Sequence, residues 1–175
     1  MPETAPHELV DIVDENDTIL YQAPKNEAHG KGLLHRTVIA ELINSRGEWI
    51  LAEPAPDRQD PGQYGSPAGG HVQAGEFVED ALRREVQEET GLENFDFRFI
   101  GKAIFRRQIL GRDENHYFIL YEIYSDAAPR ISNESVGFQT FTTEEIKRTF
   151  RMRPETFGGG FHFVAKNFYP ELLLP

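Results

Sequence analysis

Residues 70–92 read GHVQAGEFVEDALRREVQEETGL, and this stretch carries the strongest structural pattern in the chain. The part from Glu76 to Thr90 contains neither proline nor glycine, and Gly91 follows it. Glycine is common just after the last helical turn, because it adopts a positive φ without strain. The stretch therefore predicts a helix over 76–90 that follows a glycine-rich loop and ends at Gly91.

Three carboxylates of this helix lie on one side of it. At 100° per residue, Glu85, Glu88 and Glu89 fall within an arc of about 100°, which they share with apolar residues of the preceding turns. Like charges at this spacing repel, and the negative end of the helix dipole adds to the cost. A divalent cation with oxygen ligands relieves both effects, so the pattern indicates Mg²⁺ or Mn²⁺. The alternative is a solvated acidic helix balanced by Arg83 and Arg84.

Taken together, the specified positions of this stretch match the Nudix box. They are Gly70, Glu76, Arg84-Glu85-Val86, Glu88-Glu89 and Gly91-Leu92. The chain therefore resembles the Nudix hydrolase family. The resemblance implies an α/β (α+β) fold, an α/β/α sandwich around a mixed β-sheet. It also implies an enzyme that cleaves a diphosphate linkage in a nucleoside diphosphate derivative or related small molecule, by water attack at phosphorus.

The resemblance gives each matched residue an implied role. Glu85, Glu88 and Glu89 would hold the divalent ions, together with the backbone carbonyl of Gly70. Glu85, Glu88 and Arg84 are the implied catalytic residues. In the same way, Glu76 would pair with Arg84 and brace the helix.

The general base and the substrate-binding residues are less well defined. Candidates for the base are Glu85 inside the box and, outside it, Glu114 and Glu134. A diphosphate also needs positive or hydrogen-bonding partners, and the residues that we expect to bind it are Arg36, His71 and Arg106. The identity of the substrate is not determined by the sequence.

A second resemblance is to Nudix proteins related to isopentenyl-diphosphate isomerase, and it rests on Gly32-Leu33-Leu34-His35-Arg36 and Gly69-Gly70-His71. That isomerase binds a metal through histidines near these places and through a Glu-Asn-Glu segment, which Glu114-Asn115-His116 matches here. Whether His35, His71, Glu114 and His116 form a second metal site stays open. The alternative is that His35 and His116 cap strands, while His71 hydrogen-bonds in the loop or to substrate.

Two alternative functions follow from these resemblances. One is an isomerase-like enzyme, and the other is a non-catalytic Nudix sensor of nucleotides. The isomerase needs a cysteine at the junction before the helix, and this chain contains none. A sensor need not keep every carboxylate of the box, whereas this chain keeps them all. Both observations favour hydrolysis.

The rest of the chain predicts a single domain over residues 1–175, with residues 1–30 as an N-terminal β-hairpin extension. The hairpin strands are expected at 9–13 and 18–21, a connector at 26–32, and a loop at 54–67. Further strands are expected at 37–43, 49–52, 97–105, 117–124 and 136–141, with a polar loop at 111–115. A helix capped by Thr142 or Thr143 should run to about Arg151, and a last one from about His162 to Leu173.

The composition limits the classes of binding partner that we expect. The 175 residues carry a net charge of −11, which disfavours nucleic-acid binding. The chain has no cysteine, no secretory leader pattern and no apolar run of membrane-spanning length. We therefore expect a cytoplasmic protein whose partner is a small-molecule diphosphate, with no membrane and no nucleic acid. A homodimer is a hypothesis that the sequence does not test.

Overall fold

The structure, a computed structural model, describes residues 8–58, 62–109 and 111–175. The first half of the described chain contains β1 (Leu9–Val13), β2 (Ile19–Pro24), α1 (Lys25–Lys31), β3 (His35–Ile43), β4 (Trp49–Pro54), β5 (Ala68–His71) and α2 (Val78–Thr90). The second half contains β6 (Asp96–Ile109), β7 (Arg112–Tyr124), β8 (Ser135–Phe141), α3 (Thr143–Met152) and α4 (Gly159–Phe168). Two 3₁₀ turns, η1 (Pro154–Thr156) and η2 (Pro170–Leu173), flank α4.

Strand β3 organises the mixed sheet. It pairs antiparallel with β1, β4 and β5, and parallel with β7. Strand β6 forms a long hairpin with β7, and β8 pairs with β4. The parallel register sets His35 opposite His116, while the β5 register sets His71 opposite Thr37. Residues far apart in the sequence therefore meet at one end of β3.

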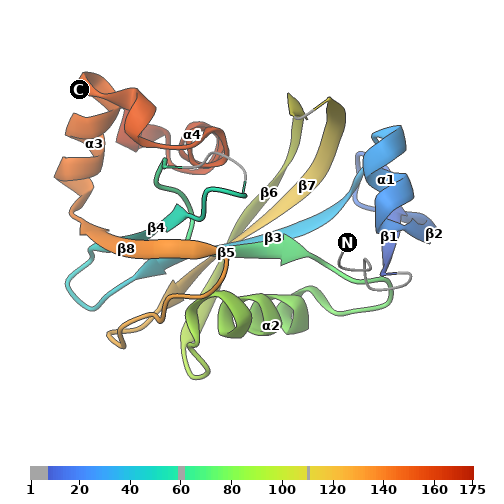
Figure 1. The fold of residues 1–175 in the computed structure, drawn as a ribbon, viewed down its shortest axis with the longest axis horizontal. Coiled ribbons are helices and arrows are strands. Elements are labelled where there is room, and N and C mark those ends of the chain that lie inside the picture. Colours follow the sequence, from blue (N-terminus) through green and yellow to red (C-terminus); the bar gives the residue numbers. More distant parts are fainter. Residues whose placement is uncertain (1–7, 59–61, 110) are drawn as a thin grey trace.

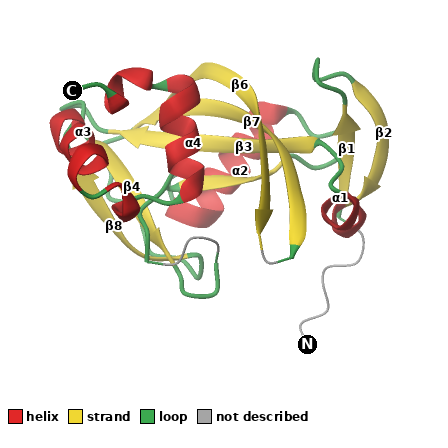
Figure 2. Ribbon diagram, turned by 90° about the horizontal axis from the view of Figure 1, so that it is seen from above, coloured by secondary structure: helices red, strands yellow, loops and turns green. Residues whose placement is uncertain are grey.

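Helices cover both faces of this sheet, as Figure 1 shows with α2 on one side and α3 and α4 on the other. Alternate side chains of β3 serve the two faces. Val38, Ala40 and Leu42 belong to the core beneath α2, whereas Ile39 and Ile43 pack against the core beneath α3 and α4. The view in Figure 2 shows α4 crossing over the sheet, with α1, β1 and β2 gathered at its far end. The expected α/β/α sandwich around a mixed sheet is confirmed.

Helix α2 is the predicted helix of the quoted stretch, and it starts two residues later than expected. Gly75 has φ 76°, and the turn that it makes leaves Glu76 outside the helix, where its carboxylate accepts a hydrogen bond from the Gln73 amide at 2.9 Å. The helix ends where it was predicted to end, since Gly91 takes the left-handed conformation with φ 74°. Thr142 caps α3 through a capping box, as one of the two expected caps.

Four local expectations need correction. The expected connector at 26–32 is helix α1, which buries Ala28 and pairs Glu27 with Lys31 at 2.8 Å. Most of the expected loop at 111–115 is strand, because residues 112–115 pair with residues 106–109 in a tight hairpin. The glycine-rich junction contains a short strand that was not expected, β5. The last helix starts at Gly159 rather than His162 and ends at Phe168, because Pro170 cannot continue it.

The expected hairpin at the N-terminal side is present as β1 and β2, of which residues 8 onward are described. Within the described part of the chain, no helix combines the length and the apolar character that a membrane span requires.

Candidate functional site

A cleft of about 680 Å³ lies between α2 and the β5 strand, and the box residues line it. From α2 come Arg84, Glu85, Glu88 and Glu89, and from the segment before β8 comes Glu134. The structure thus brings together the three predicted metal-binding carboxylates and one of the two carboxylates that were expected outside the box.

The helix sits unusually close to β5. The backbone amide of Gly69 donates a hydrogen bond to the Glu89 carboxylate at 2.6 Å. A Cβ atom at Gly70 would collide with the Glu85 carboxylate. Only glycine at position 70 therefore leaves room for the carboxylate where it lies. The absence of a side chain at Gly70 and the amide of Gly69 therefore allow two carboxylates to lie directly against the strand backbone.

Arg84 and Glu76 form the two-point ion pair that the resemblance implies. The Arg84 Nε and Nη2 atoms each donate to the Glu76 carboxylate at 3.0 Å. Nη2 also donates to the carbonyl oxygen of His71 at 3.0 Å, and Nη1 donates to Glu85 at 2.6 Å. One guanidinium thus ties the start of the helix, the strand β5 and a cleft carboxylate together.

The cleft concentrates negative charge in a partly desolvated place. Burial raises the pKa of Glu85 to about 7, although Arg84 opposes the shift. Burial, together with the neighbouring Glu134 carboxylate, raises the pKa of Glu89 to about 10. Glu88 lies at the mouth of the cleft, with 61% of its side chain exposed. Carboxylates that line one cleft suit a hard divalent cation, which would favour their ionised forms.

The arginines that were expected to bind substrate lie elsewhere. Arg36 pairs with Asp17 at 2.7 Å, and Arg106 reaches Glu15 at 3.5 Å. Neither lines the cleft, because each points toward the loop between β1 and β2. Instead, Lys25 and Arg58 line the cleft beside Arg84. No pattern in the sequence singled out these two residues, because an isolated basic residue is usually a surface residue.

His71 connects this cleft to a second cavity. The second cavity, of about 330 Å³, shares Pro54, Gly69, Gly70 and His71 with the cleft. Its other walls include Phe105, Phe118 and Phe161, together with several histidines. The expected substrate residue His71 thus lies where the two spaces adjoin.

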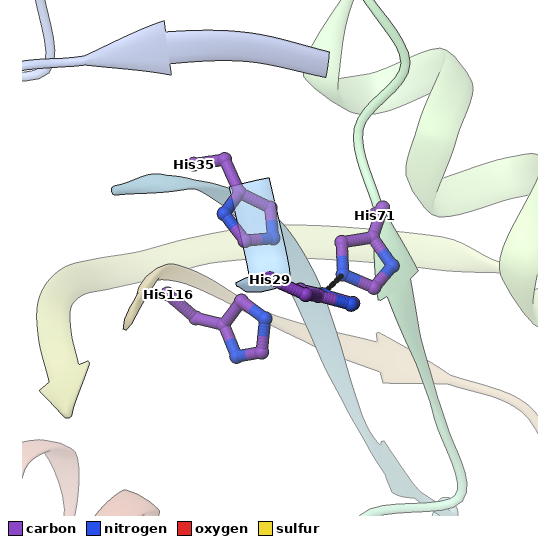
Figure 3. Close-up of side chains that lie close together, drawn as sticks. All are labelled: His29, His35, His71 and His116. Carbon is purple, nitrogen blue, oxygen red and sulfur yellow. Dashed lines mark hydrogen bonds between the residues drawn. The ribbon is translucent and has the colours of Figure 1, made fainter. Parts of the chain in front are cut away.

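Four histidines lie close together, as Figure 3 shows, and His29, His71 and His116 line this second cavity. His35, His71 and His116, whose grouping the sequence left open, lie together, and His29 of α1 joins them. Their ring centroids lie between 4.7 and 5.7 Å apart. Glu114, which is buried, precedes His116 by two residues and so lies on the same face of β7. His29 was not among the predicted site residues, because residues 26–32 were expected to be an irregular connector.

Burial favours the neutral form of two of these imidazoles, those of His35 and His71. It lowers the pKa of His35, and it lowers the pKa of His71 well below the ordinary value, with the neighbouring histidines acting in the same direction. Neutral imidazole is the form that binds metal ions.

Comparison with known proteins agrees with the fold and the cleft. The model of the NUDIX domain matches residues 33–158. This range runs from just before β3 to just before α4, and it includes the whole cleft helix. The chain therefore belongs to the Nudix family.

Several relatives show the breadth of that family. An uncharacterized Nudix hydrolase of Nostoc sp. is 41% identical over 88 residues, which are 49% of this chain and 52% of that protein. An isopentenyl-diphosphate Delta-isomerase of Pectobacterium atrosepticum is 30% identical over 87% of both chains. The crystal structure of DR0079 from Deinococcus radiodurans superposes with a TM-score of 0.74 at 24% identity, covering 93% of this chain and 99% of that one.

Proposed function

We propose that this Nudix protein is a divalent-metal-dependent hydrolase, with Mg²⁺ as the preferred ion. Its substrate is a small molecule with a diphosphate linkage, such as a nucleoside diphosphate derivative, and water attacks at phosphorus. The observation that carries the proposal is the convergence of Glu85, Glu88, Glu89 and Glu134 in one cleft against the backbone of β5.

The residues of the cleft have different proposed roles. Glu85, Glu88, Glu89 and the carbonyl oxygen of Gly70 would hold the divalent ions. When bound, these ions neutralise the diphosphate oxygens and make the attacking water more acidic. Arg84 keeps Glu85 in place through the 2.6 Å contact, and its bond to the His71 carbonyl keeps the helix on the strand. Lys25 and Arg58 supply positive charge at the wall of the cleft.

The hydrolysis balances without any further reactant. The water oxygen forms the new bond to phosphorus, the bridging P–O bond breaks, and its electron pair leaves with the departing phosphate. A carboxylate of the cleft accepts the proton of the water. Glu85 and Glu134 are the two candidates for this acceptor. A variant that loses turnover but keeps metal binding would identify the base, whereas loss of both would identify a metal ligand.

The test measures the release of phosphate or nucleotide from a panel of nucleoside diphosphate derivatives. The protein is assayed with Mg²⁺ and again after treatment with EDTA. We expect activity with Mg²⁺, none with chelator, and a decrease in turnover of roughly 10²-fold or more for Glu88→Gln and Glu89→Gln. Glu79→Gln is the control, because Glu79 is exposed on the same helix and lies outside the cleft. Full activity in EDTA, or wild-type turnover of both cleft variants, would contradict the proposal. Nucleotide binding without turnover would point to a sensor.

A further inference from the structure

We propose that His29, His35, His71 and His116 form a second metal centre that binds a transition-metal ion through imidazole nitrogen. This centre is independent of the hydrolysis proposed for the carboxylate cleft. Its imidazole ligands, His116 among them, give it a preference for such an ion over Mg²⁺.

Convergence from four separate elements is the first observation. The histidines come from α1, β3, β5 and β7, and one nitrogen of each lies within 4.8 Å of one nitrogen of every other. The Nε2 atoms of His29 and His71 are 3.0 Å apart. Nitrogen ligands around one tetrahedral ion at 2.0–2.1 Å lie about 3.3 Å from each other. Small side-chain rotations are therefore enough to bring the four nitrogens to coordination distance.

The state of His35 is the second observation. Its Nδ1 atom donates a hydrogen bond to the Leu33 carbonyl oxygen at 2.7 Å, which leaves the lone pair on Nε2. That Nε2 atom is buried and has no hydrogen-bond partner among the described residues, and the whole side chain is 0% exposed. A carbonyl that fixes the tautomer of a histidine is a regular accompaniment of metal ligation. A buried acceptor that faces three other imidazoles is an energetic cost that a bound cation removes.

Ligand chemistry then selects the kind of ion. Imidazole nitrogen suits Zn²⁺, Co²⁺, Ni²⁺ and Fe²⁺, whereas Mg²⁺ requires oxygen ligands. In this cluster all four candidate ligands are imidazoles. The two metal sites of this protein would thus select ions of different classes.

Binding there would also fasten the N-terminal elements to the sheet. His29 lies on α1, while the other three histidines lie on strands of the Nudix sheet. In the described chain, β1 has a single paired position with β3, Ile12 with His35. An ion shared between α1 and the strands would add a cross-link between the two parts, so binding should raise thermal stability.

The experiment titrates the metal-free, full-length protein with Co²⁺ and with Zn²⁺, in millimolar Mg²⁺ that occupies the carboxylate cleft. Calorimetry and the visible absorption of Co²⁺ are the readouts, and neither depends on enzymatic activity. We expect one ion bound per chain, visible bands typical of nitrogen coordination, and a higher melting temperature. Absence of saturable Co²⁺ and Zn²⁺ binding would overturn the proposal.

Variants locate the ion and test the role of His116. We expect His29→Ala and His71→Ala to weaken Co²⁺ binding by roughly 100-fold or more, while His162→Ala leaves it unchanged. His162 is the matched control, because its ring contacts the Pro154 carbonyl oxygen outside the cluster. His116→Glu should retain a site but shift its preference from Co²⁺ toward Mn²⁺. Unchanged Co²⁺ binding in both alanine variants, with circular dichroism showing that they are folded, would contradict the site. An unchanged ion preference in His116→Glu would contradict its role.

Discussion

At the scale of single residues, Gly70 controls whether the cleft can form. A Cβ atom there would collide with the Glu85 carboxylate, which Arg84 holds from the other side. We expect Gly70→Ala to push Glu85 out of place and to lower turnover by roughly 10²-fold, since small displacements of catalytic groups have effects of that size. Its melting temperature should change little, because the obstacle is the end of a flexible side chain.

The measurement is turnover and thermal melting side by side, with Gly137→Ala as the control. A Cβ atom at Gly137 meets nothing within 4 Å, so this variant should keep both properties. Wild-type turnover of Gly70→Ala would show that the close approach of backbone and carboxylate is unimportant.

The carboxyl group of Glu41, which is buried in β3, leads to a prediction about how the free energy of unfolding depends on pH. It accepts a hydrogen bond from the Ser66 hydroxyl, and burial raises its pKa to about 8 from a model-peptide value of 4.5. Between these two pH values the unfolded chain releases the proton while the folded chain keeps it. The free energy of unfolding should therefore decrease as pH rises from about 4.5 to about 8, by an amount on the order of a few kcal/mol.

Removing the titrating group should flatten this profile. We expect Glu41→Gln to lose most of that decrease between pH 5 and pH 8, as measured by denaturant unfolding at several pH values. Glu155→Gln, which changes an exposed carboxylate on η1, should keep the wild-type slope. An identical slope in Glu41→Gln and wild type would assign the pH dependence to other groups.

At the scale of secondary-structure elements, α3 depends on its first residues. The Thr142 hydroxyl accepts a hydrogen bond from the Glu145 amide at 3.1 Å, and the Glu145 carboxylate accepts one from the Thr142 amide at 2.8 Å. The helix then buries Ile146 and Phe150, four residues apart, in the core with α4. Thr142→Ala should cost about 1 kcal/mol in unfolding free energy.

Chemical denaturation would measure that loss, and Thr143→Ala is the matched control one residue along. Thr143 is exposed and lies inside the helix, so its replacement by alanine removes no cap. Equal stability of Thr142→Ala and wild type would mean that packing alone maintains α3.

At the scale of the whole molecule, the likeness to an isopentenyl-diphosphate isomerase raises the question of reaction class. Moving a double bond requires one group that gives a proton to carbon and another that removes one. The chain has no cysteine, and at the junction Ala68 and Gly69 carry no proton donor. The nearby Ser66 hydroxyl donates a hydrogen bond to Glu41, and it is a much weaker acid than a thiol. We therefore predict no isomerisation of isopentenyl diphosphate.

The check is direct incubation of the protein with isopentenyl diphosphate and Mg²⁺, with products analysed by NMR. Dimethylallyl diphosphate formed at an enzymatic rate would refute the prediction. The nucleotide panel run in parallel shows whether the same preparation hydrolyses a diphosphate.

The sequence by itself determined the parts of this protein that depend on neighbours along the chain. The helix over the box, its glycine C-cap and the carboxylate arc of Glu85, Glu88 and Glu89 all follow from spacing and local propensity, because a helix repeats every 3.6 residues. The cap of α3 and the hairpin of β1 and β2 are of the same kind. The box also sufficed to indicate the family.

Only the tertiary structure decided which distant residues meet. The register between β3 and β7 sets His35 beside His116, and the packing of α1 brings in His29, which no local pattern indicated. Tertiary packing also brings Glu134 to the cleft and turns Arg36 away from it toward Asp17. Strand pairing and side-chain pairing across the fold depend on the whole free-energy balance of burial and charge, which short-range spacing along the chain does not contain.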